Sequence, residues 1–111
     1  MGFDTFAVID WSGGNDRGAR PRKDAIWAAV ASDGGTEAPV YLRNRDVAEC
    51  WLAGLIGTSL AARRRLLAGF DFPFGYPAAF AARVTGKADP LALWDWFAEE
   101  LVDRPEVNNR F

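Results

Sequence analysis

The chain has 111 residues, half of them hydrophobic, and a formal charge of -2, so it can build one core but has no overall basic footprint for nucleic acid. With no histidine and a single cysteine, Cys50, it cannot by itself form an internal disulfide, a usual zinc site or a histidine-activated nucleophile. It has no apolar run of roughly 18 residues and no signal-peptide pattern, so we expect a cytoplasmic protein with no membrane partner.

The first part of the chain predicts three strands. Residues 4–11, DTFAVIDW, are short, apolar and rich in β-branched side chains, as a strand requires. Residues 12–24 are rich in Gly, Asn, Asp and Arg and predict a loop longer than a hairpin turn. Residues 25–32 and 39–43 predict two further strands, joined by a turn over 33–38. We expect these three strands to be antiparallel.

From Asn44 onward the hydrophobic period changes to that of a helix. Apolar residues recur every three to four positions, and Asn44 or Asp46 can cap the helix at its start. Glycine has a low helix propensity, so Gly54 and Gly57 weaken the second half. We therefore expect the helix to bend or end near these two glycines.

The remaining elements are one strand and two helices. Residues 66–72 form a nearly continuous apolar run, which predicts a strand buried on both faces in a central or parallel position. A short helix is expected over 77–84, and a longer one over 90–102, where Asp89 precedes a proline. The apolar face of the longer helix is expected to comprise Trp94, Phe97, Ala98 and Leu101. This order predicts an α/β fold with a mixed sheet, in which the fourth strand runs parallel to the first.

This arrangement makes two aspartates candidate metal ligands. Asp10 closes the first strand, and Asp71 lies between two phenylalanines near the end of the fourth. In parallel neighbouring strands both would lie at the carboxyl edge of the sheet, where open α/β folds bind ligands. A Mg²⁺ or Mn²⁺ ion shared by the two carboxylates would remove their mutual repulsion. Alternatively, each aspartate caps a turn by accepting hydrogen bonds from backbone N–H groups.

Glu49 is a third acid, on the helix between the third and fourth strands, where it could face the sheet edge. A solvated charge on the helix flank is the alternative interpretation of this residue. An acid on the first strand, one on the first helix and one on the fourth strand together resemble the ribonuclease-H-like superfamily.

The two motifs FAVIDWSGG and LAGFDFPFGYP resemble the uncharacterised bacterial predicted-nuclease proteins grouped near domain of unknown function 429. The resemblance implies a ribonuclease-H-like fold and a Mg²⁺-dependent phosphodiester hydrolase. It carries Asp10, Asp71 and Glu49 over as catalytic acids, with Asp10 and Asp71 as the metal ligands. Superfamily nucleases add a further acid after a fifth strand, and this sequence ends before such an element. We therefore expect residues 1–111 to be a single domain forming the amino-terminal part of a longer protein.

The residues that follow the first strand are candidates for binding substrate. The tryptophan directly after the first acid is well placed beside a ligand, and the arginines of the long loop could hold phosphates or lie solvated at a loop tip. The candidate substrate-binding residues are Trp11, Ser12, Gly13, Arg17 and Arg20.

Two other functions compete with the hydrolase. In an actin- or sugar-kinase-like phosphotransferase, DWSGG would be a phosphate loop, although it lacks the Asp-x-Gly-Thr form usual there. In a noncatalytic binding module, the acids would be structural. The expected partner of either enzyme is a nucleic acid or a nucleotide, and an open sheet edge would also allow a homodimer.

Overall fold

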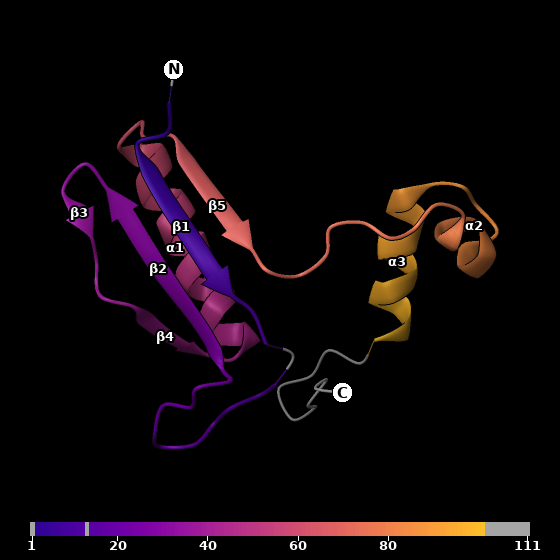
Figure 1. Cartoon of the computed structure of the whole chain (residues 1–111), viewed down its shortest axis with the longest axis horizontal. Helices are drawn as coiled ribbons and strands as arrows, with labels where there is room; N and C mark the ends of the chain where they lie inside the picture. The colour runs from indigo at the N-terminus through magenta and orange to yellow at the C-terminus, as the bar shows by residue number, and fades with distance from the viewer. Residues whose placement is uncertain (1, 13, 102–111) are drawn as a thin grey trace. The chain divides into compact units, whose positions relative to one another are not determined.

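The computed structural model describes residues 2–12 and 14–101 (Figure 1). The described residues form two compact units, 2–71 and 72–101. The first unit contains the sheet and one long helix, and the second contains two shorter helices. The assignment of the whole chain to one ribonuclease-H-like domain stays a prediction.

The first unit is built on a five-stranded mixed sheet, which confirms the expected α/β class. The strand order is β3-β2-β1-β5, and β4 also pairs with β2. β1 is antiparallel to β2 and parallel to β5. The strands are β1 (Thr5–Asp10), β2 (Ile26–Ser32), β3 (Gly35–Thr36), β4 (Val40–Arg43) and β5 (Leu66–Phe70). The two-residue β3 lies where the sequence predicts only a turn.

β5 is an edge strand within the described residues, so the prediction that it is buried on both faces was wrong. Its side chains alternate between half-buried and exposed, and Leu67 is 46% exposed. The reason is that β5 pairs with β1 alone among the described strands. A continuous apolar run therefore does not require two covered faces here.

α1 (Arg45–Ala61) runs without interruption through Gly54 and Gly57, which corrects the prediction of a bend or an end. Asn44 caps it as expected, because its side chain accepts a hydrogen bond from the backbone N–H of Val47 at 3.2 Å. Each glycine costs only about 1 kcal/mol of helix propensity. Packing of the helix on the sheet, through buried Ala48 and its neighbours, outweighs that cost.

The core of the first unit lies between α1 and one face of the sheet (Figure 1). Side chains of β1 alternate strictly between buried and exposed, as expected for a strand with one covered face. The buried core residues are Ala7, Ile9, Ile26, Ala28, Val30, Leu42 and Ala48. The opposite face of the sheet leaves Phe6 45% and Val8 63% exposed. This open face also carries Asp10.

The second unit consists of α2 (Phe80–Thr85) and α3 (Pro90–Glu100). α2 begins three residues later than predicted, after Ala79, whose φ of 69° is in the left-handed region. Asp89 caps α3 by accepting a hydrogen bond from the N–H of Leu91 at 2.9 Å, as its position before proline predicts. Leu93 is the buried residue of α3, whereas the predicted face residue Leu101 is 53% exposed.

An aromatic cluster joins the two helices of the second unit to the segment before them. The Tyr76 ring stacks on Phe80 at 5.2 Å between centroids and contacts Phe97 at 5.4 Å.

Within residues 2–12 and 14–101, no helix is long and apolar enough to cross a bilayer.

Candidate functional site

The parallel pairing of β1 and β5 brings Asp10 and Asp71 together. Ile9 and Phe70 are the last partners in this register, and the two aspartates are the next residues on their chains. Adjacent strands lie about 4.8 Å apart, so the two carboxylates come from neighbouring positions on one edge of the sheet. Asp10 is exposed, in alternation with buried Ile9, and so projects from the face opposite α1.

The pKa of the Asp10 carboxyl lies above its usual range. The main cause is a hydrogen bond with the Asp71 carboxyl, followed by partial desolvation and then by repulsion from the Asp71 charge. The Asp10 carboxyl therefore keeps its proton more readily than an isolated aspartic acid does. A cation could occupy the same position and relieve the same repulsion.

Asp71 also accepts a hydrogen bond from a backbone N–H group, which belongs to a distant segment and not to its own turn. Its Oδ1 accepts a hydrogen bond from the N–H of Trp11 at 2.7 Å, across 60 positions of sequence. The Trp11 ring in turn meets Phe70 edge-on, with centroids 6.3 Å apart. This backbone bond is compatible with metal binding by Asp71, because it orients the carboxylate beside Asp10.

Glu49 does not form a three-acid site with this pair. It lies exposed on α1, and the described part of the chain holds no group of three or more Asp, Glu, His or Cys side chains placed to bind a metal. Two carboxylates are sufficient for Mg²⁺, which commonly keeps several waters and takes one or two protein ligands. Asp10 and Asp71 are therefore compatible with a Mg²⁺ site formed by two carboxylates.

The candidate substrate-binding residues lie at different places on the loop after β1. The Oγ of Ser12 accepts a hydrogen bond from the N–H of Gly14 at 3.2 Å, whereas Gly13 lies outside the described residues. Arg17 forms an ion pair with Asp46 of α1 at 3.5 Å, and Arg20 is exposed. The structure therefore uses Arg17 to link the loop to the start of α1.

Asp16 anchors the same loop to β4 and α1. Its carboxylate accepts hydrogen bonds from the Tyr41 hydroxyl and from the N–H of Gly18, and its carbonyl accepts one from the Asn44 amide. The Tyr41 hydrogen bond is the main reason that the pKa of Asp16 is lowered. Burial is the main reason that the pKa of Tyr41 is raised.

Sequence reasoning missed a row of side chains that crosses the sheet beside Asp10. Asp10 pairs with Trp27 of β2, and Trp27 pairs with Tyr41 of β4. Paired residues on adjacent strands project to the same face, so both rings share the open face with Asp10. The ring centroids of Trp27 and Tyr41 are 5.0 Å apart, and both residues are half-buried. From sequence, Trp27 is expected to fill the core, and only the strand register reveals its neighbours.

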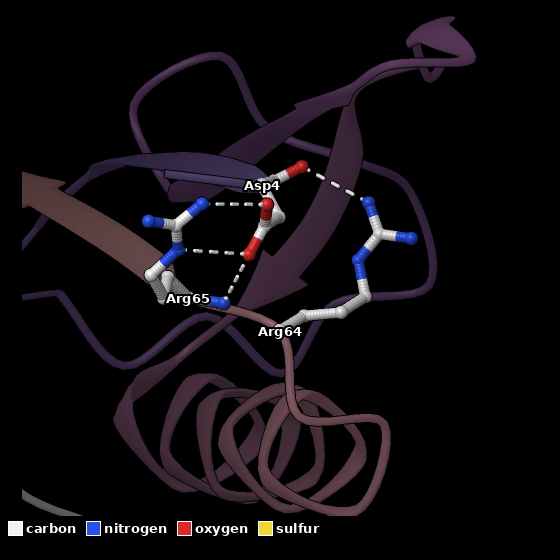
Figure 2. A network of polar contacts seen from close by, with 3 residues as sticks. All are labelled: Asp4, Arg64 and Arg65. Carbon is white, nitrogen blue, oxygen red and sulfur yellow. Dashed lines mark hydrogen bonds and ion pairs between the residues drawn. The ribbon is translucent and has the colours of Figure 1, made fainter. Parts of the chain in front are cut away.

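A second charged cluster lies at the other end of β1 (Figure 2). The Asp4 carboxylate accepts three hydrogen bonds from Arg65, at 2.7 Å from its backbone N–H, 3.2 Å from Nε and 3.2 Å from the terminal nitrogen. Arg64 donates to the Asp4 carbonyl at 3.0 Å. These contacts, led by the Arg65 side chain, lower the pKa of Asp4 to about 2. The cluster ties the start of β1 to the start of β5.

Comparison of the chain with known proteins finds no matching family model, no matching curated protein and no matching solved structure.

Proposed function

We propose that this protein is a Mg²⁺- or Mn²⁺-dependent phosphodiester hydrolase of the ribonuclease-H-like type, acting on a nucleic acid or a nucleotide. The observation that supports it is the parallel register of β1 and β5, in which the carboxylates of Asp10 and Asp71 come from neighbouring positions at the carboxyl ends of the two strands. The raised pKa of Asp10 agrees with this proposal, because carboxyl groups with shifted pKa values are common at functional sites.

Both residues of the pair would have the same task in the proposed site, which is to bind the divalent ion. A bound divalent ion would activate water for attack on the phosphodiester. Asp10 and Asp71 would bind that ion through oxygen, and the Trp11 N–H would hold Asp71 in its orientation. The motif resemblance named above supports the same two residues, while Glu49 stays outside the two-acid arrangement.

The phosphotransferase alternative receives less support. A phosphate loop at DWSGG would need backbone N–H groups aimed at the ligand. The N–H of Gly14 instead donates to the Ser12 hydroxyl, and Gly14 is buried. Among the described residues of this motif, the geometry of Gly14 therefore gives the phosphate loop no support.

The first test is calorimetric titration of Mg²⁺ and Mn²⁺ into the wild-type chain and the variants Asp10→Asn and Asp71→Asn. We expect saturable binding to the wild type and its loss in both variants. Asp33→Asn removes the same charge from an exposed turn between β2 and β3 and should leave binding unchanged. Equal binding by all four proteins would contradict the assigned ligands.

Thermal unfolding gives an independent test of the same pair. A carboxyl whose pKa is raised in the folded state adds stability at low pH and loses it as pH rises through the folded pKa. At pH 7 in EDTA, Asp10→Asn should therefore have a higher Tm than the wild type, because it removes the repulsion. Saturating Mg²⁺ should raise the Tm of the wild type and not of the variant. If the variant is less stable in EDTA and both respond alike to Mg²⁺, the two acids are structural.

A further inference from the structure

Trp27 and Tyr41 lie in one line with the proposed metal ligands across four strands of the sheet. The line runs from the end of β5 through β1 and β2 to β4, following the register Asp10–Trp27–Tyr41. At about 4.8 Å per strand it extends roughly 14 Å. That length suits a short segment of oligonucleotide better than a single phosphate group.

The two rings are held in fixed orientations by their polar atoms. The indole Nε1 of Trp27 donates to the carbonyl of Arg22 at 2.9 Å, and the Tyr41 hydroxyl donates to the Asp16 carboxylate. Because these polar groups are already bonded within the protein, the rings have only their aromatic surfaces to offer a ligand. Fixed aromatic surfaces bind planar groups with little loss of conformational entropy.

The two ends of the line differ in their charged groups. Asp71 and Asp10 are at one end, whereas the guanidinium of Arg43 lies 5.4 Å from the centroid of the Tyr41 ring at the other. Arg22 and Arg43 are both close enough to Asp16 to help lower its pKa. The order of groups is therefore carboxylates, aromatic rings, then two arginines that outnumber the single Asp16 carboxylate beside them.

From this order we infer that Trp27 and Tyr41 form a stacking subsite for an unpaired base, so that the substrate of the proposed hydrolase is single-stranded nucleic acid. The inference rests on the proposed function for the position of the reacting phosphate. A base stacks on the rings, and the arginines face a neighbouring phosphate of the same strand. A base within a duplex has both faces covered by its neighbours and cannot bind in this way.

The test is fluorescence anisotropy with a fluorescein-labelled DNA strand of mixed sequence, long enough to form a stable duplex, used single-stranded or annealed to its complement, in EDTA. We expect the protein to bind the single strand more tightly than the duplex. Trp27→Ala should weaken single-strand binding by roughly 5- to 100-fold, and Trp27→Phe should retain most of it because a ring remains. Phe6→Ala removes an exposed ring from the same sheet face away from the line and should have no effect.

The same measurements are repeated in the Asp10→Asn background. This substitution removes one negative charge and so weakens the repulsion between the metal-free acids and a phosphate. Circular dichroism of each variant shows whether the fold is intact, and Tyr41→Leu provides a second removal of a ring if Trp27→Ala fails to fold. The subsite would be overturned if the protein bound no single strand in either background, or if it bound duplex as tightly as single strand. It would also be overturned if Trp27→Ala and Phe6→Ala weakened single-strand binding equally. Single-strand binding that depends on Trp27 without any metal binding would uphold the subsite and refute the hydrolase, so the two proposals fail separately.

Discussion

At the scale of single residues, Asp4 and Asp10 border the same strand and their carboxyl pKa values move in opposite directions. Arg65 lowers the pKa of Asp4, and Asp71 raises that of Asp10. The first shift stabilises the folded chain at neutral pH, whereas the second destabilises it. A bound metal ion would therefore stabilise the ionised form of Asp10.

Asp4→Asn should make the protein less stable at neutral pH and remove part of its sensitivity to acid. The pKa of Asp4 falls from 3.8 to about 2 on folding, so its contribution is complete above pH 4 and is lost as pH drops towards 2. Urea midpoints measured from pH 2 to 7 should therefore differ between wild type and variant at pH 7 and converge near pH 2. Asp33→Asn is the control, and a constant difference across the whole range would contradict the assignment.

At the scale of elements, α1 shows how packing overrides a local weakness. Thr58, one turn after Gly54, donates its hydroxyl hydrogen bond to the Gly54 carbonyl at 2.8 Å. The helix continues to Ala61 because its inner face is packed against the sheet, whatever the propensity of its exposed glycines. Glycine at position 54 is thus a cost to the helix that the structure does not require.

Gly54→Ala should raise the free energy of unfolding by about 0.5 to 1 kcal/mol. The residue is exposed and helical, and an added Cβ would meet no atom within 4 Å. Gly35→Ala is the matched control, since its Cβ also meets no atom but its φ of 106° disfavours alanine. Urea denaturation should show opposite signs for the two variants, and a destabilised Gly54→Ala would mean that the glycine has a role in α1.

At the scale of the whole molecule, stability of the first unit depends on one apolar layer between α1 and the sheet. Ile9, Ile26 and Leu42 are its largest fully buried side chains, and they come from three different strands. Loss of any one of them would therefore affect the sheet and the helix together. The layer also supports the strand ends that carry Asp10 and Trp27.

Leu42→Ala should lower the free energy of unfolding by about 2 to 5 kcal/mol, because it leaves a cavity in this layer. Leu42 is 2% exposed, whereas Leu60 on α1 is 72% exposed. Leu60→Ala should change stability by no more than about 0.5 kcal/mol. Similar losses in the two variants, measured by urea denaturation, would show that the buried layer does not dominate stability.

The sequence by itself determined those features that depend on nearby residues. The first strand, the helix after Asn44 and the proline start of α3 after Asp89 were all predicted, because strand character, helical period and capping depend on residues close in sequence. The parallel pairing of the first and fourth predicted strands was a hypothesis from their order, and the register of β1 and β5 confirms it.

Only the tertiary structure decided the contacts between distant residues. The edge position of β5, the Asp4–Arg65 cluster and the row from Asp10 to Tyr41 depend on strand order and register. The full length of α1 depends on the packing of the helix against the sheet. The hydrogen bond from Trp11 to Asp71 joins positions 60 residues apart. Local propensity carries no information about such pairs, since the free energy that selects them comes from burying one shared core.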